Sequence, residues 1–402
     1  MHILDNFGLF GGFVGLIFLL YMTYYLLTAV NRPVFICKNE KLRTFMTTNM
    51  PTLSERFWPT VWCFSGRLQT IAQGILNTMN IVSVDYRREM VHTPDGGEIA
   101  IDWADNDDGS PYETSERPIV IIIPGLAGSS EEDYIKRMVI AALELGYRVV
   151  VFNNRGLGQT KLKTPRTFAM TKSEDTRLVI SHIRASYPRV PLIAEGFSAG
   201  AITLFHYLSH YGEDSHLQAA MLNSVLFEAF ETTRSIESFF NLHLLNRLLT
   251  KALVQLVVLP NLDILSQNTD LDISSILQAR TAREYHTRLT TPMFGYEDWK
   301  EFYKECCTAG KMHMVKIPML ILNAADDPFA PKQSIPIEEI KQQENVMLAL
   351  MSHGGHNAFL TGFLPTGRSF DVEVFSQFVS TIFRNNLPII NNNKEIKINN
   401  NR

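Results

Sequence analysis

Cysteine is scarce in this chain of 402 residues, which has four: Cys37, Cys63, Cys306 and Cys307. Four cysteines at these spacings fit neither a disulfide framework nor a zinc site. The sequence also has no Asn-X-Ser/Thr acceptor for N-linked glycans, which favours a cytosolic catalytic domain. No basic stripe interleaved with aromatic residues is present, and the formal net charge is −4. We therefore expect no nucleic-acid partner.

Charge is absent from Phe7 to Val30. A helix of this length crosses a hydrocarbon core of about 30 Å. The alternatives are a cleaved signal peptide and a buried core helix, but residues 1–6 lack the basic start of a signal peptide. We therefore expect a short N-terminal segment at 1–6 and a retained single-pass transmembrane anchor at 7–30. By the positive-inside rule, the cations that follow place the rest of the chain in the cytosol: Arg32, Lys38, Lys41 and Arg43.

Strand-like and helix-like segments alternate from Glu89 onward. The expected strands are Glu89–Thr93, Glu98–Trp103, Ile119–Pro124, Arg148–Asn153, Leu192–Phe197, Ala219–Ser224, Met319–Asn323 and Val346–Met351. The expected helices are Glu131–Leu145, Ser173–Ser186, Ala199–Tyr211 and Phe370–Arg384. Continuous apolar runs such as Ile119–Ile123 are typical of parallel strands that are covered on both faces. These patterns predict an α/β fold with a mostly parallel, eight-stranded sheet in a domain at residues 87–388.

Three segments lie outside this alternation. Residues 31–86 contain short apolar patches and several prolines, and we expect a connector there. Residues 226–315 carry leucine and phenylalanine pairs at helical spacing, which predicts a helical cap inserted over the sheet. Packing on the core and contact with a membrane both explain that apolar spacing. Residues 389–402 are rich in asparagine and are expected to be a disordered tail.

The pentapeptide Gly196–Gly200 has the pattern G-x-S-x-G, with an apolar strand before it and a predicted helix after it. This context is typical of a nucleophile elbow, in which Ser198 lies on a sharp turn from strand to helix. The small flanking glycines allow strand and helix to approach each other closely. The alternative is a glycine-rich loop that matches the pattern by chance.

A serine nucleophile needs a base and a residue that orients the base. In α/β-hydrolases these follow in the order Ser, acid, His. Asp326 and Asp327 both follow the strand Met319–Asn323 and are both candidates for the acid. His356 is the candidate base, with His353 as its competitor on the same loop.

The tetrahedral intermediate of ester hydrolysis needs two N–H donors for its oxyanion. We expect one from Ala199, directly after the serine, and the other from Leu126 in the loop Pro124–Gly128. That loop lacks the glycine spacing of a nucleotide-binding loop. The reaction expected of these residues requires no cofactor or metal, and the sequence signals none, so we expect neither.

With these residues in place, the chain resembles the membrane-anchored α/β-hydrolase-domain (abhydrolase-domain) lipases, and within them the type-one/type-three branch. The resemblance extends from about Trp58 to Phe383. Its marks are Trp62–Thr70, Pro124–Gly128, Phe152–Gly156, Thr164–Thr167, Met293–Tyr296, Asn323–Pro328 and Gly354–His356. It implies an α/β-hydrolase fold and a catalytic triad of Ser198, Asp327 and His356.

The resemblance also implies phospholipase A-type or acylglycerol lipase activity on lipid esters, through an acyl-enzyme on Ser198. It implies a single-pass protein of the endoplasmic reticulum membrane with a lumenal domain, whereas the basic flank favours the cytosol, so both orientations stay open. The alternative function is a catalytically silent α/β-hydrolase fold that binds or signals. A peptidase is disfavoured by the anchor, and an epoxide hydrolase by serine where such enzymes use aspartate.

Overall fold

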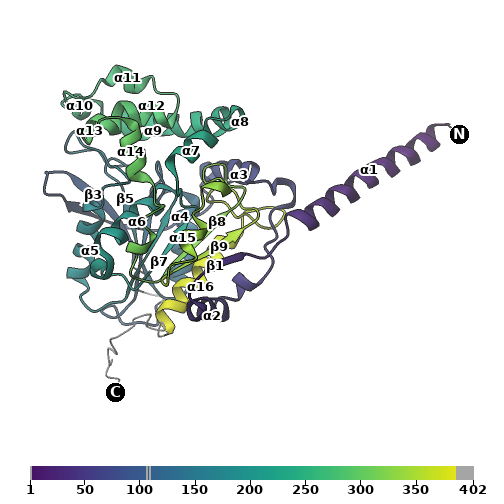
Figure 1. The fold of residues 1–402 in the computed structure, drawn as a ribbon, viewed down its shortest axis with the longest axis horizontal. Helices are drawn as coiled ribbons and strands as arrows, with labels where there is room; N and C mark the ends of the chain where they lie inside the picture. Colours follow the sequence, from purple (N-terminus) through teal and green to yellow (C-terminus); the bar gives the residue numbers. More distant parts are fainter. Residues whose placement is uncertain (1, 106, 108–109, 386–402) are drawn as a thin grey trace.

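A nine-stranded sheet forms the centre of the computed structural model, which describes residues 2–105, 107 and 110–385 (Figure 1). The strand order is β1-β9-β8-β7-β6-β4-β5-β3-β2. The strands are β1 Val34–Cys37, β2 Arg87–His92, β3 Glu98–Ala104, β4 Ile119–Ile123, β5 Arg148–Asn153, β6 Leu192–Phe197, β7 Ala219–Asn223, β8 Met319–Ala324 and β9 Val346–Met351. The six strands from β5 to β9 in this order are parallel, and β1, β2 and β3 are antiparallel to their neighbours.

The prediction of eight strands was one strand short. All eight are present, but β1 adds a ninth from within the expected connector, with Val34 opposite Leu350 of β9. A four-residue segment is too short to show a strand period. Its conformation is fixed by pairing with β9, more than 300 residues away in the sequence, so local pattern does not reveal it.

Helices cover both faces of the sheet. The helices α2 (Glu40–Asn49), α4 (Asp133–Glu144) and α16 (Phe370–Arg384) pack on one face, and α5 (Glu174–Ser186) and α6 (Ala199–Tyr211) pack on the other. Within β4, Ile121 belongs to the core under α5 and α6, whereas Ile122 belongs to the core under α4 and α16. Because both faces are buried, every position of this strand is apolar.

A series of short helices separates β7 from β8 and lies at the top of the molecule in Figure 1. We call it the cap. Its elements are α7 Ala229–Ile236, α8 Phe239–Asn241, α9 Arg247–Leu253, α10 Leu262–Leu265, α11 Ile273–Leu277, α12 Ala282–Tyr285, α13 Thr291–Met293 and α14 Trp299–Cys306, with π-helical turns at Leu242–Asn246, Val254–Val258 and His286–Thr290. The cap has its own small core around Leu253, Val257 and Leu289.

The helix α1 (His2–Thr28) projects from the body (Figure 1). The helix α3 (Gly66–Met79) lies on the body, near the point where α1 leaves it. Among the residues that the structure describes, two helical segments are long and apolar enough to cross a membrane, judged by length and composition. Phe10–Thr28 has a mean hydropathy of 1.8 and is 6% buried, and Phe239–Leu265 has 1.6 and is 33% buried. The second lies in the cap. The expected asparagine-rich tail lies outside the described residues.

Candidate active site

Ser198 lies on a tight turn between β6 and α6. Its φ of +53° and ψ of −116° are unusual for a residue with a side chain. The turn depends on the two flanking glycines, because a Cβ on Gly196 would lie 2.5 Å from the Gly200 carbonyl oxygen. A Cβ on Gly200 would lie 2.2 Å from the Ile123 carbonyl oxygen. The sequence G-x-S-x-G thus folds into the sharp strand-to-helix turn that a nucleophile elbow requires, with the Ser198 hydroxyl at the carboxyl end of β6.

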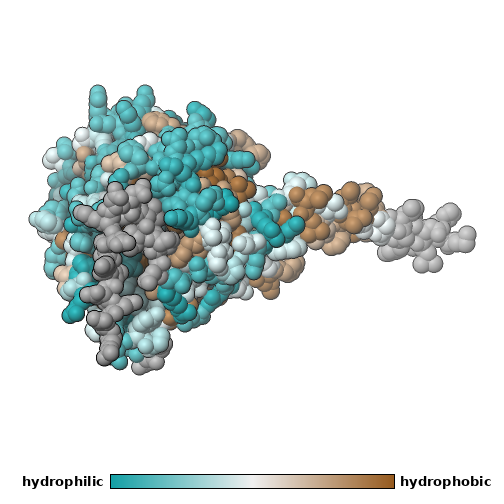
Figure 2. All heavy atoms as spheres, turned by 60° about the horizontal axis from the view of Figure 1, so that its bottom comes forward, coloured by the Kyte–Doolittle hydropathy of each residue, from teal (hydrophilic) through white to brown (hydrophobic). Residues whose placement is uncertain are grey.

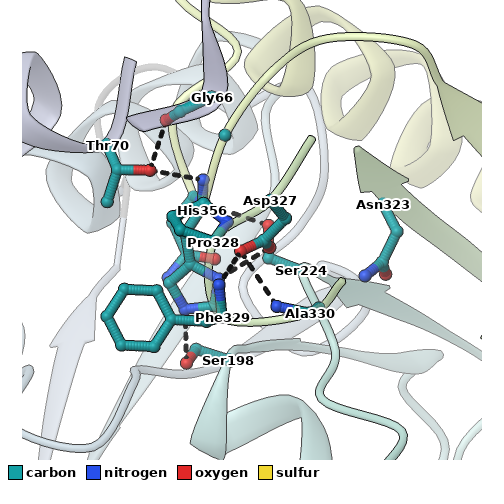
Figure 3. Close-up of polar contacts among 12 residues, drawn as sticks. Gly66, Thr70, Ser198, Ser224, Asn323, Asp327, Pro328, Phe329, Ala330 and His356 are labelled. Atoms are coloured by element: carbon teal, nitrogen blue, oxygen red, sulfur yellow. Dashed lines mark hydrogen bonds and ion pairs between the residues drawn. The ribbon is translucent and has the colours of Figure 1, made fainter. Parts of the chain in front are cut away.

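The structure brings Ser198, His356 and Asp327 together in a hydrogen-bonded chain (Figure 3). The Oγ of Ser198 is 2.7 Å from Nε2 of His356, and Nδ1 of His356 is 2.8 Å from Oδ2 of Asp327. The three residues come from loops that follow β6, β8 and β9. Because these strands are parallel, their carboxyl ends meet at one edge of the sheet. This is the geometry in which a histidine accepts a serine proton while a carboxylate orients the ring.

Two adjacent carboxylates follow β8, and they point to different partners. Asp327 is buried, and its Oδ1 accepts the N–H groups of Phe329 at 2.7 Å and Ala330 at 3.1 Å. Asp326 accepts the N–H of Gly355 at 3.1 Å instead. Burial raises the pKa of Asp326 to about 7, and the neighbouring Asp327 adds to the effect. Of the two candidate acids, Asp327 is therefore the one placed to orient His356.

Two contacts that the sequence analysis did not anticipate hold His356. Its backbone N–H donates to Oγ1 of Thr70 at 2.9 Å, and its ring stacks on Phe329 with centroids 4.5 Å apart. Thr70 lies on α3, within the expected connector, and ends the motif Trp62–Thr70 that marks the resemblance. That motif was the available signal, but nothing in it indicated this role. The competing His353 lies elsewhere, with Nδ1 3.1 Å from Oγ of Ser352.

A cavity of about 310 Å³ lies over Ser198, between the sheet and the cap. Leu126 and Ala199 line it, as do apolar cap residues such as Ile236 and Leu256. Among the described residues, the N–H groups of Leu126 and Ala199 have no hydrogen-bond acceptor, so both are available to an oxyanion.

The loop that carries Leu126 is held from below by a tyrosine. The N–H of Gly125 donates to Oη of Tyr134 at 3.1 Å. Glu132 also borders the cavity, and burial raises its pKa to about 7 against the lowering effect of Lys136. In the part of the chain that the structure describes, no group of three or more His, Cys, Asp or Glu side chains is placed to hold a metal ion.

Comparison with known proteins agrees with this fold. Residues 118–363 match the model of the alpha/beta hydrolase fold family. The chain is similar to human phospholipase ABHD3, with 38% identity over 381 residues that cover 93% of this chain and 92% of the relative. It is also similar to a monoacylglycerol lipase of Saccharomyces cerevisiae, with 26% identity over 88% of this chain and 86% of the relative.

Among solved structures, an esterase of Pyrococcus furiosus, Pf2001, has a TM-score of 0.49 and 16% identity, covering 75% of this chain and 91% of that chain. The family match and the near full-length similarity to phospholipase ABHD3 lead to one conclusion: the chain belongs to the α/β-hydrolase family, among its abhydrolase-domain lipases.

Proposed function

We propose that this protein hydrolyses carboxylic esters of lipids, phospholipids or acylglycerols, through an acyl-enzyme on Ser198. His356 takes the Ser198 proton as the hydroxyl attacks the ester carbonyl, and Asp327 stabilises the imidazolium that forms. The N–H groups of Leu126 and Ala199 stabilise the oxyanion. His356 then protonates the leaving alcohol. A water molecule, deprotonated by His356, releases the fatty acid and restores the serine.

The observation that carries this proposal is the hydrogen-bonded chain from Ser198 through His356 to Asp327 at a cavity with mostly apolar walls. An apolar wall suits the acyl chain of a lipid, because burying each methylene contributes about 0.8 kcal/mol. The similarity to proteins named as a phospholipase and a monoacylglycerol lipase supports an ester of a lipid as substrate.

The exposed apolar surface of α1 supports association with a membrane. We propose a single-pass anchor, in the endoplasmic reticulum as the family resemblance implies. Protease treatment of sealed microsomes that contain the full chain tests the side of the catalytic domain. Digestion without detergent indicates the cytosol, and protection until detergent is added indicates the lumen.

Replacement of the nucleophile tests the reaction. We expect Ser198→Ala to lower kcat toward p-nitrophenyl butyrate and phosphatidylcholine by roughly 10⁶-fold, as loss of the nucleophile does in a serine protease. The wild type should be labelled by a fluorophosphonate probe, and Ser198→Ala should not be. Ser238→Ala, at an exposed serine of the cap, is the matched control and should keep both label and activity.

Equal turnover by Ser198→Ala and the wild type would refute the proposal. An unlabelled and inactive wild type would favour the alternative, a silent fold that serves in binding.

A further inference from the structure

Large apolar side chains are exposed on the body around the base of α1. Six of them define what we call the docking face: Trp58, Trp62, Leu68, Ile75, Phe363 and Leu364. Each is between 49% and 73% exposed. Scattered exposed hydrophobic residues are ordinary, but a gathered set marks a surface that another apolar body covers.

The helix α3 contributes an outward apolar stripe to this face. Leu68, Ile75 and Met79 are seven and four positions apart, so they lie on one side of the helix. Ala72 and Leu76, which lie next to this stripe around the helix, are buried, so the apolar side of α3 runs from the core out to the surface. A helix on the surface of a soluble protein normally places polar residues outward. An apolar outer stripe is instead typical of contact with lipid.

The docking face is continuous with α1 where that helix leaves the body. The Oη of Tyr25 donates to the Pro59 carbonyl oxygen at 2.7 Å, which fixes the base of α1 beside the segment that carries Trp58 and Trp62. Nε1 of Trp62 in turn donates to the Phe363 carbonyl oxygen at 2.7 Å. Figure 2 shows hydrophobic residues along α1 and in patches on the body.

The same surface extends to the cap. Nε of Arg67, on α3, donates to Oδ1 of Asn241 at 2.7 Å, which joins α3 to α8. This short helix carries Phe239 and Phe240, which are 74% and 63% exposed. In Figure 1, α3 lies beside the base of α1, and α8 lies at the end of the cap that is nearer to α1.

We propose that the docking face lies in the headgroup and upper acyl layer of the phospholipid bilayer that α1 crosses. The body then contacts lipid directly, beyond its covalent attachment to an anchor. We favour a bilayer over a second copy of the chain as the partner of the docking face. The face adjoins α1, and α1 itself lies in lipid when it crosses the membrane. Tryptophan and tyrosine at the junction are the residues enriched at membrane interfaces.

This surface lies one helix away from the proposed catalytic centre. Ile71 of α3 packs in the same hydrophobic cluster as Ile236 and Phe329, which both line the cavity. Thr70, the residue before Ile71 on α3, accepts the backbone N–H of His356. The consequence for substrate, which rests on the proposed function, is that lipid esters reach the cavity from the interfacial layer rather than from water.

Tryptophan fluorescence tests the docking without any enzyme turnover. The full chain is reconstituted in vesicles of phosphatidylcholine with brominated or unmodified acyl chains. Trp58 and Trp62 are two of the four tryptophans; Trp103 is buried, and Trp299 lies on α14 of the cap. We expect brominated lipid to quench up to about half of the emission. Trp58→Phe/Trp62→Phe should abolish this quenching, and Trp299→Phe should retain it.

Equal fractional quenching in the wild type and in Trp58→Phe/Trp62→Phe would overturn the proposal, as would a wild type that brominated lipid does not quench. Cross-linking of the docking faces of two copies, with no quenching, would assign the face to self-association and also overturn it. Because this readout is independent of Ser198, it decides the docking even if the proposed reaction fails.

Acidic substitutions on α3 test the consequence for substrate. We expect Leu68→Glu/Ile75→Glu to lower turnover of phosphatidylcholine in vesicles roughly tenfold or more, because two charges oppose insertion into the interface. Turnover of soluble p-nitrophenyl butyrate should stay within about twofold. Leu277→Glu, at an exposed leucine of α11, is the control and should change neither rate. Equal losses on both substrates would show that the substitutions damage α3 itself, and would overturn the substrate consequence.

Discussion

Replacing Thr70 by valine tests whether α3 positions the proposed catalytic histidine. The Thr70 hydroxyl donates to the Gly66 carbonyl oxygen at 2.7 Å and accepts the His356 N–H at 2.9 Å. Valine has nearly the same shape but neither donates nor accepts. The substitution therefore removes the acceptor of a partly buried backbone N–H while leaving the packing of α3 nearly unchanged.

The size of the effect follows from the cost of an unmade hydrogen bond. A buried N–H without a partner costs about 1–3 kcal/mol. Because the His356 N–H is only partly buried, we expect a cost in the lower part of this range, about 1–2 kcal/mol. If that cost applies to the arrangement in which His356 contacts Ser198, kcat falls roughly 5- to 30-fold. KM should change little, because Thr70 is not among the residues that line the cavity.

The assay is steady-state hydrolysis of p-nitrophenyl butyrate by the full chain in detergent, with the melting temperature measured in parallel. Thr70→Ser keeps the hydroxyl and should stay within about twofold of the wild type. A Thr70→Val variant with wild-type kcat would refute the positioning role. So would a Thr70→Ser variant that is as slow as Thr70→Val, since the lost feature would then be shape.

Three further predictions concern the surroundings of the site. Gly200→Ala should abolish folding or lower the free energy of unfolding by about 3 kcal/mol or more, measured by denaturant unfolding, because the alanine Cβ would lie 2.2 Å from a carbonyl oxygen of β4. The control is Gly74→Ala, where the new Cβ enters open space on α3, and it should be neutral or stabilising. Burial raises the pKa of Asp326 to about 7, so the folded protein keeps this proton between about pH 4 and 7, whereas the unfolded chain has released it. The free energy of unfolding therefore falls as the pH rises through this range. Asp326→Asn should therefore melt higher relative to the wild type at pH 8 than at pH 5, and a constant difference in melting temperature would contradict this. Tyr134→Phe leaves the Gly125 N–H without its acceptor and should lower kcat roughly tenfold, measured with the soluble ester; an unchanged kcat would show that the tyrosine does not hold the loop.

Local sequence was sufficient to predict two kinds of segment. These are segments with a clear pattern of apolar residues and turns whose backbone geometry requires glycine. The run Ile119–Ile123 is apolar at every position because both of its faces are buried, and β4 lies there. Gly196 and Gly200 are required by close backbone contacts, so the pentapeptide indicated the turn directly.

The parts that sequence did not predict depend on contacts between distant residues. Thr70 meets His356 across 286 positions of the chain, and no local pattern encodes that pairing. The choice between Asp326 and Asp327 depends on which carboxylate the turn after β8 directs toward the histidine. Residue type is the same at both positions, so the family resemblance, and not composition or spacing, separated them.

The first strand changes how the N-terminal region should be regarded. Because β1 pairs with β9 along its full length, it covers the outer edge of the parallel sheet. Removal of residues 1–37 to obtain a soluble form would leave β9 with a row of unpaired N–H and C=O groups, which is a template for edge-to-edge aggregation. The segment after α1 thus protects the edge of the sheet from pairing with other chains. A truncated protein that keeps the fold should therefore begin before Val34.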